Sequence, residues 1–191
     1  MKSVTLKKIV LIGASTGGPG QIEKIISSLP ILRNSSIIIA QHMVVGFLES
    51  FASRMQSNAQ NNVSVITNKQ KLQSNHIYVA EGNTFLHQNN FLFETSLSSN
   101  NSYNPNINIL FSSFVPLVKE LDILCVILTG IGDDGVNACK ELSNHGARCI
   151  TESEKSAIVD GMPNRARSLV DNIEVHDINE ISKIIHEFCN V

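Results

Sequence analysis

Short, uninterrupted apolar runs recur along this chain, and segments with helical spacing of apolar residues lie between them. The runs cover residues 8–12, 37–40, 63–66, 76–79, 124–128 and 147–150, and the helical spacing covers 21–29, 46–55, 134–145 and 178–188. An apolar run without polar alternation is typical of a strand that is covered on both faces, as in a parallel sheet. Strands that alternate with helices imply right-handed crossovers. The sequence therefore predicts an α/β fold with a doubly wound, mostly parallel sheet flanked by helices.

Three segments depart from this alternation. Residues 84–86 and 91–93 flank Asn89-Asn90, which predicts a small antiparallel hairpin. Residues 95–106 are rich in Ser and Asn and predict a surface loop that is too short to separate two domains. Residues 107–121 have helical spacing, but Pro116 lies inside the run and is expected to kink or shorten the helix. We expect one domain over residues 1–191.

The composition excludes several classes of protein. Apolar residues are 42% and charged residues 17% of the 191, as in ordinary globular proteins, and no apolar run approaches the roughly 20 residues that a membrane helix needs. The first nine residues lack the apolar core of a signal peptide, so we expect a cytoplasmic protein that does not insert into membranes. The net charge is −2 and no basic stripe is present, which predicts no nucleic-acid partner.

The four cysteines lie far apart in the sequence and form no C-x-x-C pair. This spacing predicts reduced thiols in or near the core, with no metal site. No cofactor is implied either. The cysteines are Cys125, Cys139, Cys149 and Cys189.

The first apolar run opens into a glycine-rich turn, Gly13-Ala14-Ser15-Thr16-Gly17-Gly18, that leads into a predicted helix. The pattern G-x-S-x-G between a strand and a helix is typical of a nucleophile elbow, in which a tight turn exposes the serine hydroxyl at the edge of the sheet. Ser15 is therefore the candidate nucleophile. The alternative is a turn that binds phosphate or dinucleotide, since helix N-termini suit anions. Against it, the glycines do not fit G-x-G-x-x-G, the second strand ends in Gln41-His42 rather than an acidic residue, and a Walker lysine is absent.

Two further strand ends carry polar residues that complete a hydrolytic site. His42 closes the second predicted strand, and the carboxyl ends of neighbouring strands share one crevice, so its imidazole is the candidate general base. The turn after residues 124–128 carries Asp133 and Asp134, either of which is placed to orient His42. The alternative role for these aspartates is to cap the helix that follows.

The sequence at this point closely resembles the catalytic domain of the chemotaxis protein-glutamate methylesterases, the CheB family, over nearly its whole length. The motifs that carry the resemblance are Gly13-Ala14-Ser15-Thr16-Gly17-Gly18, Gln41-His42-Met43, Leu128-Thr129-Gly130-x-Gly132-x-Asp134-Gly135 and Gly161-Met162-Pro163. The resemblance implies that Ser15 is the nucleophile, His42 the base and Asp134, rather than Asp133, the orienting carboxylate.

The resemblance also implies an activity and a partner. The expected activity is hydrolysis of glutamyl methyl esters on the cytoplasmic helices of methyl-accepting chemoreceptors, with deamidation of certain receptor glutamines as a second reaction. An oxyanion would meet backbone N–H groups near the nucleophile and in the third turn. The residues expected to supply or support these donors are Thr16, Gly17, Gly130, Ile131 and Gly132. The alternatives are an esterase or amidase of the same family with another substrate, and a binding module without activity.

Three departures from the family pattern are visible. Family members commonly carry an N-terminal receiver domain, and here the catalytic strand begins within the first dozen residues, so we expect no receiver domain. Ile131 replaces a common Met in the third turn, an exchange that is expected to leave the backbone donors in place. Residues 104–108 read Asn-Pro-Asn-Ile-Asn where the family usually has Arg-Pro-Ser-Val-Asp, so a positive charge and a carboxylate are both replaced. We expect this change to affect substrate binding more than chemistry.

Overall fold

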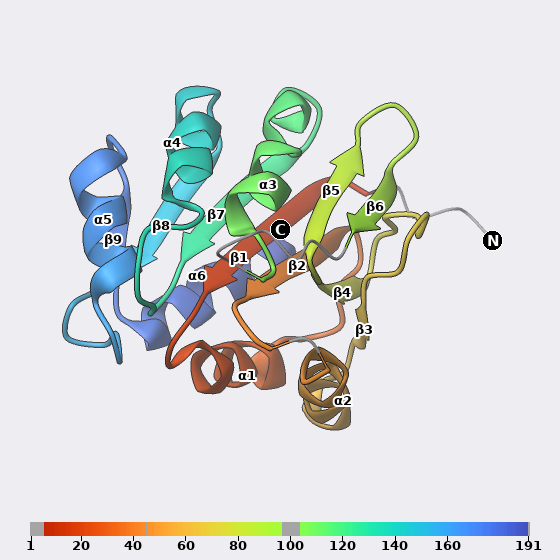
Figure 1. Cartoon of the computed structure of the whole chain (residues 1–191), viewed down its shortest axis with the longest axis horizontal. Helices are drawn as coiled ribbons and strands as arrows, with labels where there is room; N and C mark the ends of the chain where they lie inside the picture. The colour runs from red at the N-terminus through yellow and green to blue at the C-terminus, as the bar shows by residue number, and fades with distance from the viewer. Residues whose placement is uncertain (1–5, 45, 97–103, 191) are drawn as a thin grey trace.

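A seven-stranded parallel sheet forms the centre of the computed structural model, which describes residues 6–44, 46–96 and 104–190 (Figure 1). The strand order is β3-β4-β2-β1-β7-β8-β9, and every neighbouring pair is parallel. The strands are β1 (Lys8–Ala14), β2 (Ser35–Gln41), β3 (Asn62–Val65), β4 (His76–Val79), β7 (Asp122–Ile127), β8 (Arg148–Glu152) and β9 (Glu174–His176). The predicted doubly wound sheet is confirmed.

Helices cover both faces of this sheet. Figure 1 shows α1, α2 and α6 on one side of the strands and α3, α4 and α5 on the other. The helices are α1 (Gly18–Ser28), α2 (Leu48–Asn58), α3 (Ile107–Ser112), α4 (Val136–Asn144), α5 (Gly161–Leu169) and α6 (Ile178–Asn190). Among these helices of the described ranges, none is long and apolar enough to cross a membrane.

The two covered faces explain why the strands are apolar without alternation. Successive side chains of a strand point to opposite faces, and in β1 this places Ile9 and Leu11 in one hydrophobic core and Val10 and Ile12 in the other. All four side chains are fully buried. A polar residue at any of them would lose water without a partner, so the pattern follows from the layer structure.

The predicted hairpin is confirmed as a separate two-stranded antiparallel sheet. It consists of β5 (Asn83–His87) and β6 (Leu92–Ser96), with Leu86 opposite Phe93 in the register. Both of these side chains are buried in the core beneath α3. Of the loop predicted over residues 95–106, residues 97–103 lie outside the described part of the chain.

The structure corrects several predicted boundaries. The helical segment 107–121 is divided into α3 and a 3-10 turn, Val115–Leu117, which is the shortening expected at Pro116, since proline lacks the N–H that a continuous α-helix requires. Helix α1 begins at Gly18, ahead of the apolar spacing, with Pro19 in its first turn. Helix α5 and strand β9 were not predicted. Strand β9 has only three residues at the sheet edge, none of them buried, so it has no apolar run to reveal it.

The direction in which successive strands are added to the sheet reverses beside β1. After β1 the chain builds β2, β3 and β4 on one side and then crosses to build β7, β8 and β9 on the other. In open α/β sheets, ligands bind outside the carboxyl ends of the strands at such a switch point. This position lies between the ends of β1 and β7.

Candidate active site

The three turns that carry the candidate residues meet at this switch point. Ser15 directly follows β1 and His42 directly follows β2, and the two strands are paired to their last residues, Ala14 opposite Gln41. The His42 N–H donates to the carbonyl oxygen of Ala14 over 2.9 Å. On the other side of β1, the Ser15 N–H donates to the carbonyl oxygen of Thr129 over 3.0 Å. The predicted residues therefore share one edge of the sheet.

Glycines allow the turn at Ser15 to form and the neighbouring turn to approach it. Gly17 has a φ of 85°, a left-handed conformation that ends the turn just before α1. A Cβ atom on Gly130 would lie 2.7 Å from the Cβ of Ser15 and 2.4 Å from the sulfur of Met162. Only a residue without a side chain fits at 130, and this lets the turn after β7 pack against the turn at Ser15.

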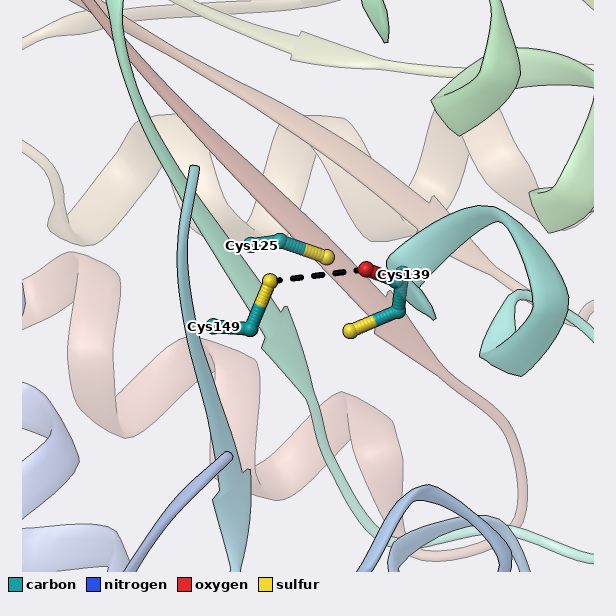
Figure 2. Close-up of side chains that lie close together, drawn as sticks. All are labelled: Cys125, Cys139 and Cys149. Carbon is teal, nitrogen blue, oxygen red and sulfur yellow. Dashed lines mark hydrogen bonds between the residues drawn. The ribbon is translucent and has the colours of Figure 1, made fainter. Parts of the chain in front are cut away.

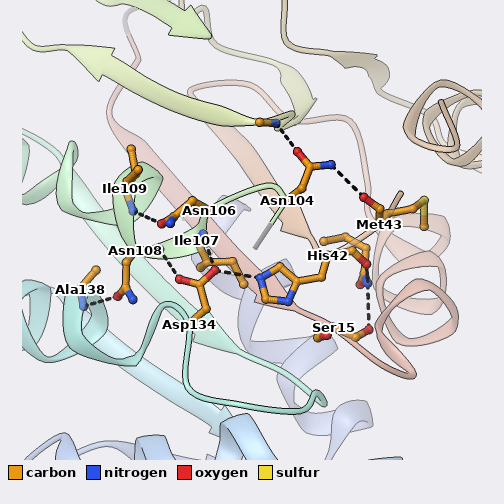
Figure 3. A network of polar contacts seen from close by, with 12 residues as sticks. Ser15, His42, Met43, Asn104, Asn106, Ile107, Asn108, Ile109, Asp134 and Ala138 are labelled. Carbon is orange, nitrogen blue, oxygen red and sulfur yellow. Dashed lines mark hydrogen bonds and ion pairs between the residues drawn. The ribbon is translucent and has the colours of Figure 1, made fainter. Parts of the chain in front are cut away.

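His42 and Asp134 are joined by a hydrogen bond between Nε2 and Oδ2, 2.8 Å long (Figure 3). The histidine side chain is 13% exposed and the aspartate 1%. Asp134 also accepts the backbone N–H of Ile107 at Oδ2 over 2.8 Å and that of Asn108 at Oδ1 over 3.0 Å. Three donors therefore hold both carboxylate oxygens in one orientation.

Of the two adjacent aspartates, the structure selects Asp134 as the partner of His42. Asp133 is exposed, and its carbonyl oxygen accepts the N–H of Val136. The alternative in which an aspartate side chain caps the following helix is wrong, because Gly135 occupies the N-cap of α4 with a φ of 90°. Asp134 instead binds free N–H groups in the first turn of α3, a helix on another part of the chain.

The departure at residues 104–108 builds part of this site. The Asn108 side chain, in the first turn of α3, accepts the N–H of Ala138 in the first turn of α4 over 3.0 Å, while Asp134, just before α4, accepts N–H groups in the first turn of α3. Asn104 bridges two loops: its side-chain oxygen accepts the N–H of Gly82 and its amide donates to the carbonyl of Met43, both over 3.0 Å. Asn104 thus holds the residue that follows His42, and Asn108 joins the two helices that flank Asp134.

The orientation of the imidazole determines which nitrogen can act as a base. A proton on Nε2 is donated to Asp134, so the basic nitrogen is Nδ1, and in the view of Figure 3 the ring lies between Asp134 and Ser15. Within the described residues, the Ser15 hydroxyl makes no hydrogen bond to His42. Such bonds are often long in unliganded sites and tighten when substrate binds, and a serine hydroxyl reorients by rotation about χ1.

The five backbone amides predicted to supply or support an oxyanion site differ in whether they already make a hydrogen bond. The amide of Gly130 donates to the carbonyl of Val159 over 2.9 Å, and Gly130 packs closely against Ser15, which fits a supporting role for this residue rather than that of a donor. The remaining four predicted amides donate to no other group in the part of the chain that the structure describes. These are the amides of Thr16, Gly17, Ile131 and Gly132.

Gln41 is a buried residue of the site that the sequence reasoning did not assign. Its side chain is 1% exposed, and its amide nitrogen donates to the carbonyl oxygens of Ser15 and His42, each over 2.8 Å. One side chain thus joins the turn at Ser15 to the turn at His42. Its position at the buried end of a strand, where a polar side chain needs a partner, is the signal that marks it.

Replacement of Gln41 by Glu is expected to lower kcat about 10- to 100-fold with a smaller change in KM. The carboxylate cannot donate, so the carbonyls of Ser15 and His42 each lose the hydrogen bond from residue 41, at a cost of about 1–3 kcal/mol, and the two turns shift. Steady-state kinetics on an ester substrate measures the split. Gln56→Glu on α2, which loses a donor to Asn61 far from the site, is the matched control. An equal effect of the two substitutions would contradict the assignment.

A second buried residue, Glu152 at the end of β8, holds the turn after β7. Its carboxylate accepts the N–H of Thr129 over 3.0 Å, the amide of Gln21 over 2.9 Å and the hydroxyl of Ser156 over 2.6 Å. Thr129 in turn donates its hydroxyl to the carbonyl of Thr16 over 2.8 Å. Burial raises the pKa of Glu152 above its ordinary value of 4.5.

The raised pKa of Glu152 predicts a pH-dependent stability. The unfolded chain ionises this group near pH 4.5, but the folded chain does so only at higher pH, so the free energy of unfolding is expected to fall as the pH rises through that window. Glu152→Gln removes this titration, and its stability relative to the wild type is expected to improve as the pH rises above 4.5. Urea denaturation at several pH values measures the difference.

Glu174 provides a control of opposite sign. Hydrogen bonds from Arg148 lower the pKa of Glu174 to about 2. The stabilisation that the ionised Glu174 adds to the folded protein is therefore fully present above pH 4.5 and is lost as the pH falls toward 2. Glu174→Gln is therefore expected to lose stability relative to the wild type as the pH rises toward 4.5. A pH-independent difference for Glu152→Gln would contradict the role of its carboxylate.

Comparison with known proteins identifies the same fold and family. A family model described as CheB methylesterase matches residues 10–185. The protein-glutamate methylesterase/protein-glutamine glutaminase 2 of Carboxydothermus hydrogenoformans is 33% identical over 190 residues, which are 96% of this chain and 54% of that protein. The protein-glutamate methylesterase/protein-glutamine glutaminase of Escherichia coli O157:H7 is 30% identical over 182 residues, 93% of this chain and 52% of that protein. The crystal structure of the Thermotoga maritima CheB methylesterase catalytic domain superposes with a TM-score of 0.82 at 27% identity, covering 95% of this chain and 98% of that domain.

The fold and the site define a doubly wound α/β protein that carries serine, histidine and aspartate at the carboxyl ends of three neighbouring strands. The chain spans about half the length of the curated relatives it matches. It belongs to the CheB methylesterase family.

Proposed function

We propose that this chain is a serine hydrolase that removes methyl esters from glutamate side chains of chemoreceptors and deamidates receptor glutamines. The observation that carries the proposal is the hydrogen bond between His42 and the buried Asp134, beside the turn that presents Ser15. The names of the relatives support both reactions, since they are called protein-glutamate methylesterase/protein-glutamine glutaminase.

In the proposed mechanism, the Ser15 hydroxyl attacks the carbonyl carbon of the glutamyl ester. His42 takes the hydroxyl proton at Nδ1, and Asp134 stabilises the imidazolium through Nε2. The imidazolium then gives the proton to the leaving group as its bond to the carbonyl carbon breaks, so that the methoxy oxygen of an ester departs as methanol and the amide nitrogen of a glutamine departs as ammonia. Water activated by His42 hydrolyses the acyl-enzyme and releases glutamate. The negative oxygen of each tetrahedral intermediate would face the amides of Thr16 and Gly17 at the N-terminus of α1, where the helix dipole favours it.

The surface around the site suits a protein substrate better than a small ester. Exposed apolar side chains lie on or close along the chain to these turns: Ile131 in the turn after β7 is 63% exposed, Ile158 is 67% exposed, and Phe47, at the N-cap of α2 five residues after His42, is 63% exposed. Ile158 packs against the nucleophile turn, because a Cβ on Gly17 would lie 2.5 Å from its Cβ. An amphipathic helix, such as the cytoplasmic helices of methyl-accepting chemoreceptors, can cover such side chains with its apolar face.

The test is methanol release from a purified, methylated receptor fragment. Wild-type protein is expected to release methanol and leave glutamate, whereas the Ser15→Ala variant is expected to release none. Mass spectrometry of the receptor peptides identifies the ester and the glutamine sites that change. Absence of methanol release, together with hydrolysis of an unrelated ester or amide through Ser15, would point to another substrate. Binding of nucleotides without any hydrolysis would favour a non-enzymatic role.

A further inference from the structure

Three of the four cysteines meet in the core beneath α4, although 24 residues separate the first from the last. Cys125 lies in β7, Cys149 is its register partner in β8, and Cys139 lies over them on α4 (Figure 2). Their sulfur atoms all lie within 4.8 Å of one another. All three are buried and free of disulfides. Cys189 is buried in the core on the other face of the sheet, apart from this group.

The three side chains leave a shared centre between their sulfurs. Figure 2 shows the sulfurs of Cys125, Cys139 and Cys149 converging from three directions. The Cys149 thiol also contacts the carbonyl oxygen of Cys139 over 3.5 Å, which draws strand β8 and helix α4 together. Around one metal ion, ligands at the roughly 2.3 Å of a metal–thiolate bond lie about 4 Å apart, so the observed spacing needs only a small inward movement.

The donor set restricts the kind of ion. Sulfur ligands select soft ions such as monovalent copper and zinc, whereas carboxylate and water suit magnesium or calcium. Structural zinc sites are almost always four-coordinate, and the cluster found among the described residues supplies three sulfurs with no histidine or carboxylate. Iron–sulfur clusters likewise take four cysteines as a rule.

Charge restricts the ion further. Burying a net charge in an apolar core is costly. A monovalent ion is neutralised by a single thiolate, with the other two sulfurs as neutral donors, whereas a divalent ion needs two. We propose that Cys125, Cys139 and Cys149 form a three-sulfur binding site for monovalent copper. Binding replaces the proton of one thiol, which leaves to solvent, and transfers no electron.

The test is titration of the purified, reduced protein with Cu(I) under anaerobic conditions, in competition with a chromophoric Cu(I) chelator. The wild type is expected to take one copper per chain. X-ray absorption at the copper edge is expected to show sulfur ligands only. The matched variants are Cys139→Ala, which removes one ligand, and Cys189→Ala, which removes a buried cysteine outside the cluster.

Cys189→Ala is expected to bind copper as the wild type does, and Cys139→Ala is expected to lose the competition with the chelator. If Cys139→Ala does not fold, Cys149→Ser replaces it, and the absorption spectrum of the wild type tests the ligand set without any variant. The proposal would be overturned if the wild type takes up no copper, or if the spectrum shows oxygen or nitrogen ligands. It would also be overturned if Cys139→Ala takes up copper as the wild type does, or if the protein binds stoichiometric zinc in preference to copper. If the wild type takes up no copper, the three thiols serve only as small apolar core residues.

Discussion

Replacement of Ser15 by alanine is expected to abolish ester hydrolysis while the protein remains folded. In serine hydrolases whose triad acts as a unit, loss of the serine lowers kcat by roughly 10⁶-fold. The Ser15 backbone, not its hydroxyl, makes the contacts that hold the turn: its N–H donates to Thr129 and its carbonyl accepts Gly18 and Gln41. Alanine preserves all of these.

Single-turnover and steady-state assays with a methylated receptor fragment or an activated ester measure this loss, and a fluorophosphonate probe reports directly on the nucleophile. The probe is expected to label the wild type at Ser15 and to leave Ser15→Ala unlabelled. Ser53→Ala, at an exposed position of α2, is the control and is expected to change neither readout. Unaltered hydrolysis by the Ser15→Ala variant would contradict the proposed mechanism.

Replacement of Asp134 by asparagine is expected to damage both catalysis and stability. The carboxylate accepts three hydrogen bonds, from His42, Ile107 and Asn108, and is 1% exposed. An asparagine can present only one acceptor atom, so its NH₂ group must face at least one of these donors. Loss of the acceptor for the imidazole is expected to lower kcat by roughly 10⁴-fold, as in other triads in which an asparagine selects the wrong tautomer. Because the NH₂ group then faces a buried N–H donor, the free energy of unfolding is expected to fall by about 1–3 kcal/mol.

Asp133→Asn is the matched control, since it makes the same chemical change one residue away at an exposed position. It is expected to leave kcat and stability within the range of ordinary surface substitutions, about 0.5 kcal/mol. Chemical denaturation and kinetics are measured on both variants. A loss of stability in Asp134→Asn with unchanged kcat would mean that Asp134 only caps α3. A loss of activity with no loss of stability would mean that the bonds to α3 contribute little.

The layers of the fold and the nucleophile turn follow from local patterns. A strand covered on both faces must be apolar at consecutive positions, so residues 8–12 and 37–40 mark buried parallel strands without any knowledge of their neighbours. The turn at Ser15 is equally local, because its glycines and the following helix lie within a few residues. Apolar spacing alone would give one helix over residues 107–121, and Pro116, which acts on backbone hydrogen bonds that the spacing does not report, predicted the shortening that the structure shows.

The sequence by itself determined the doubly wound sheet, the strand ends that carry Ser15 and His42, and two candidate aspartates. Residue patterns left Asp133 and Asp134 open and the family resemblance favoured Asp134, but only the tertiary structure shows the contacts, because they join Asp134 to His42, 92 positions away, and to the first turn of α3. The same reason applies to Gln41, whose amide links two turns, and to the three cysteines beneath α4. Periodicity reports which face of an element is buried, but the pairing of side chains from different elements depends on sheet order and register.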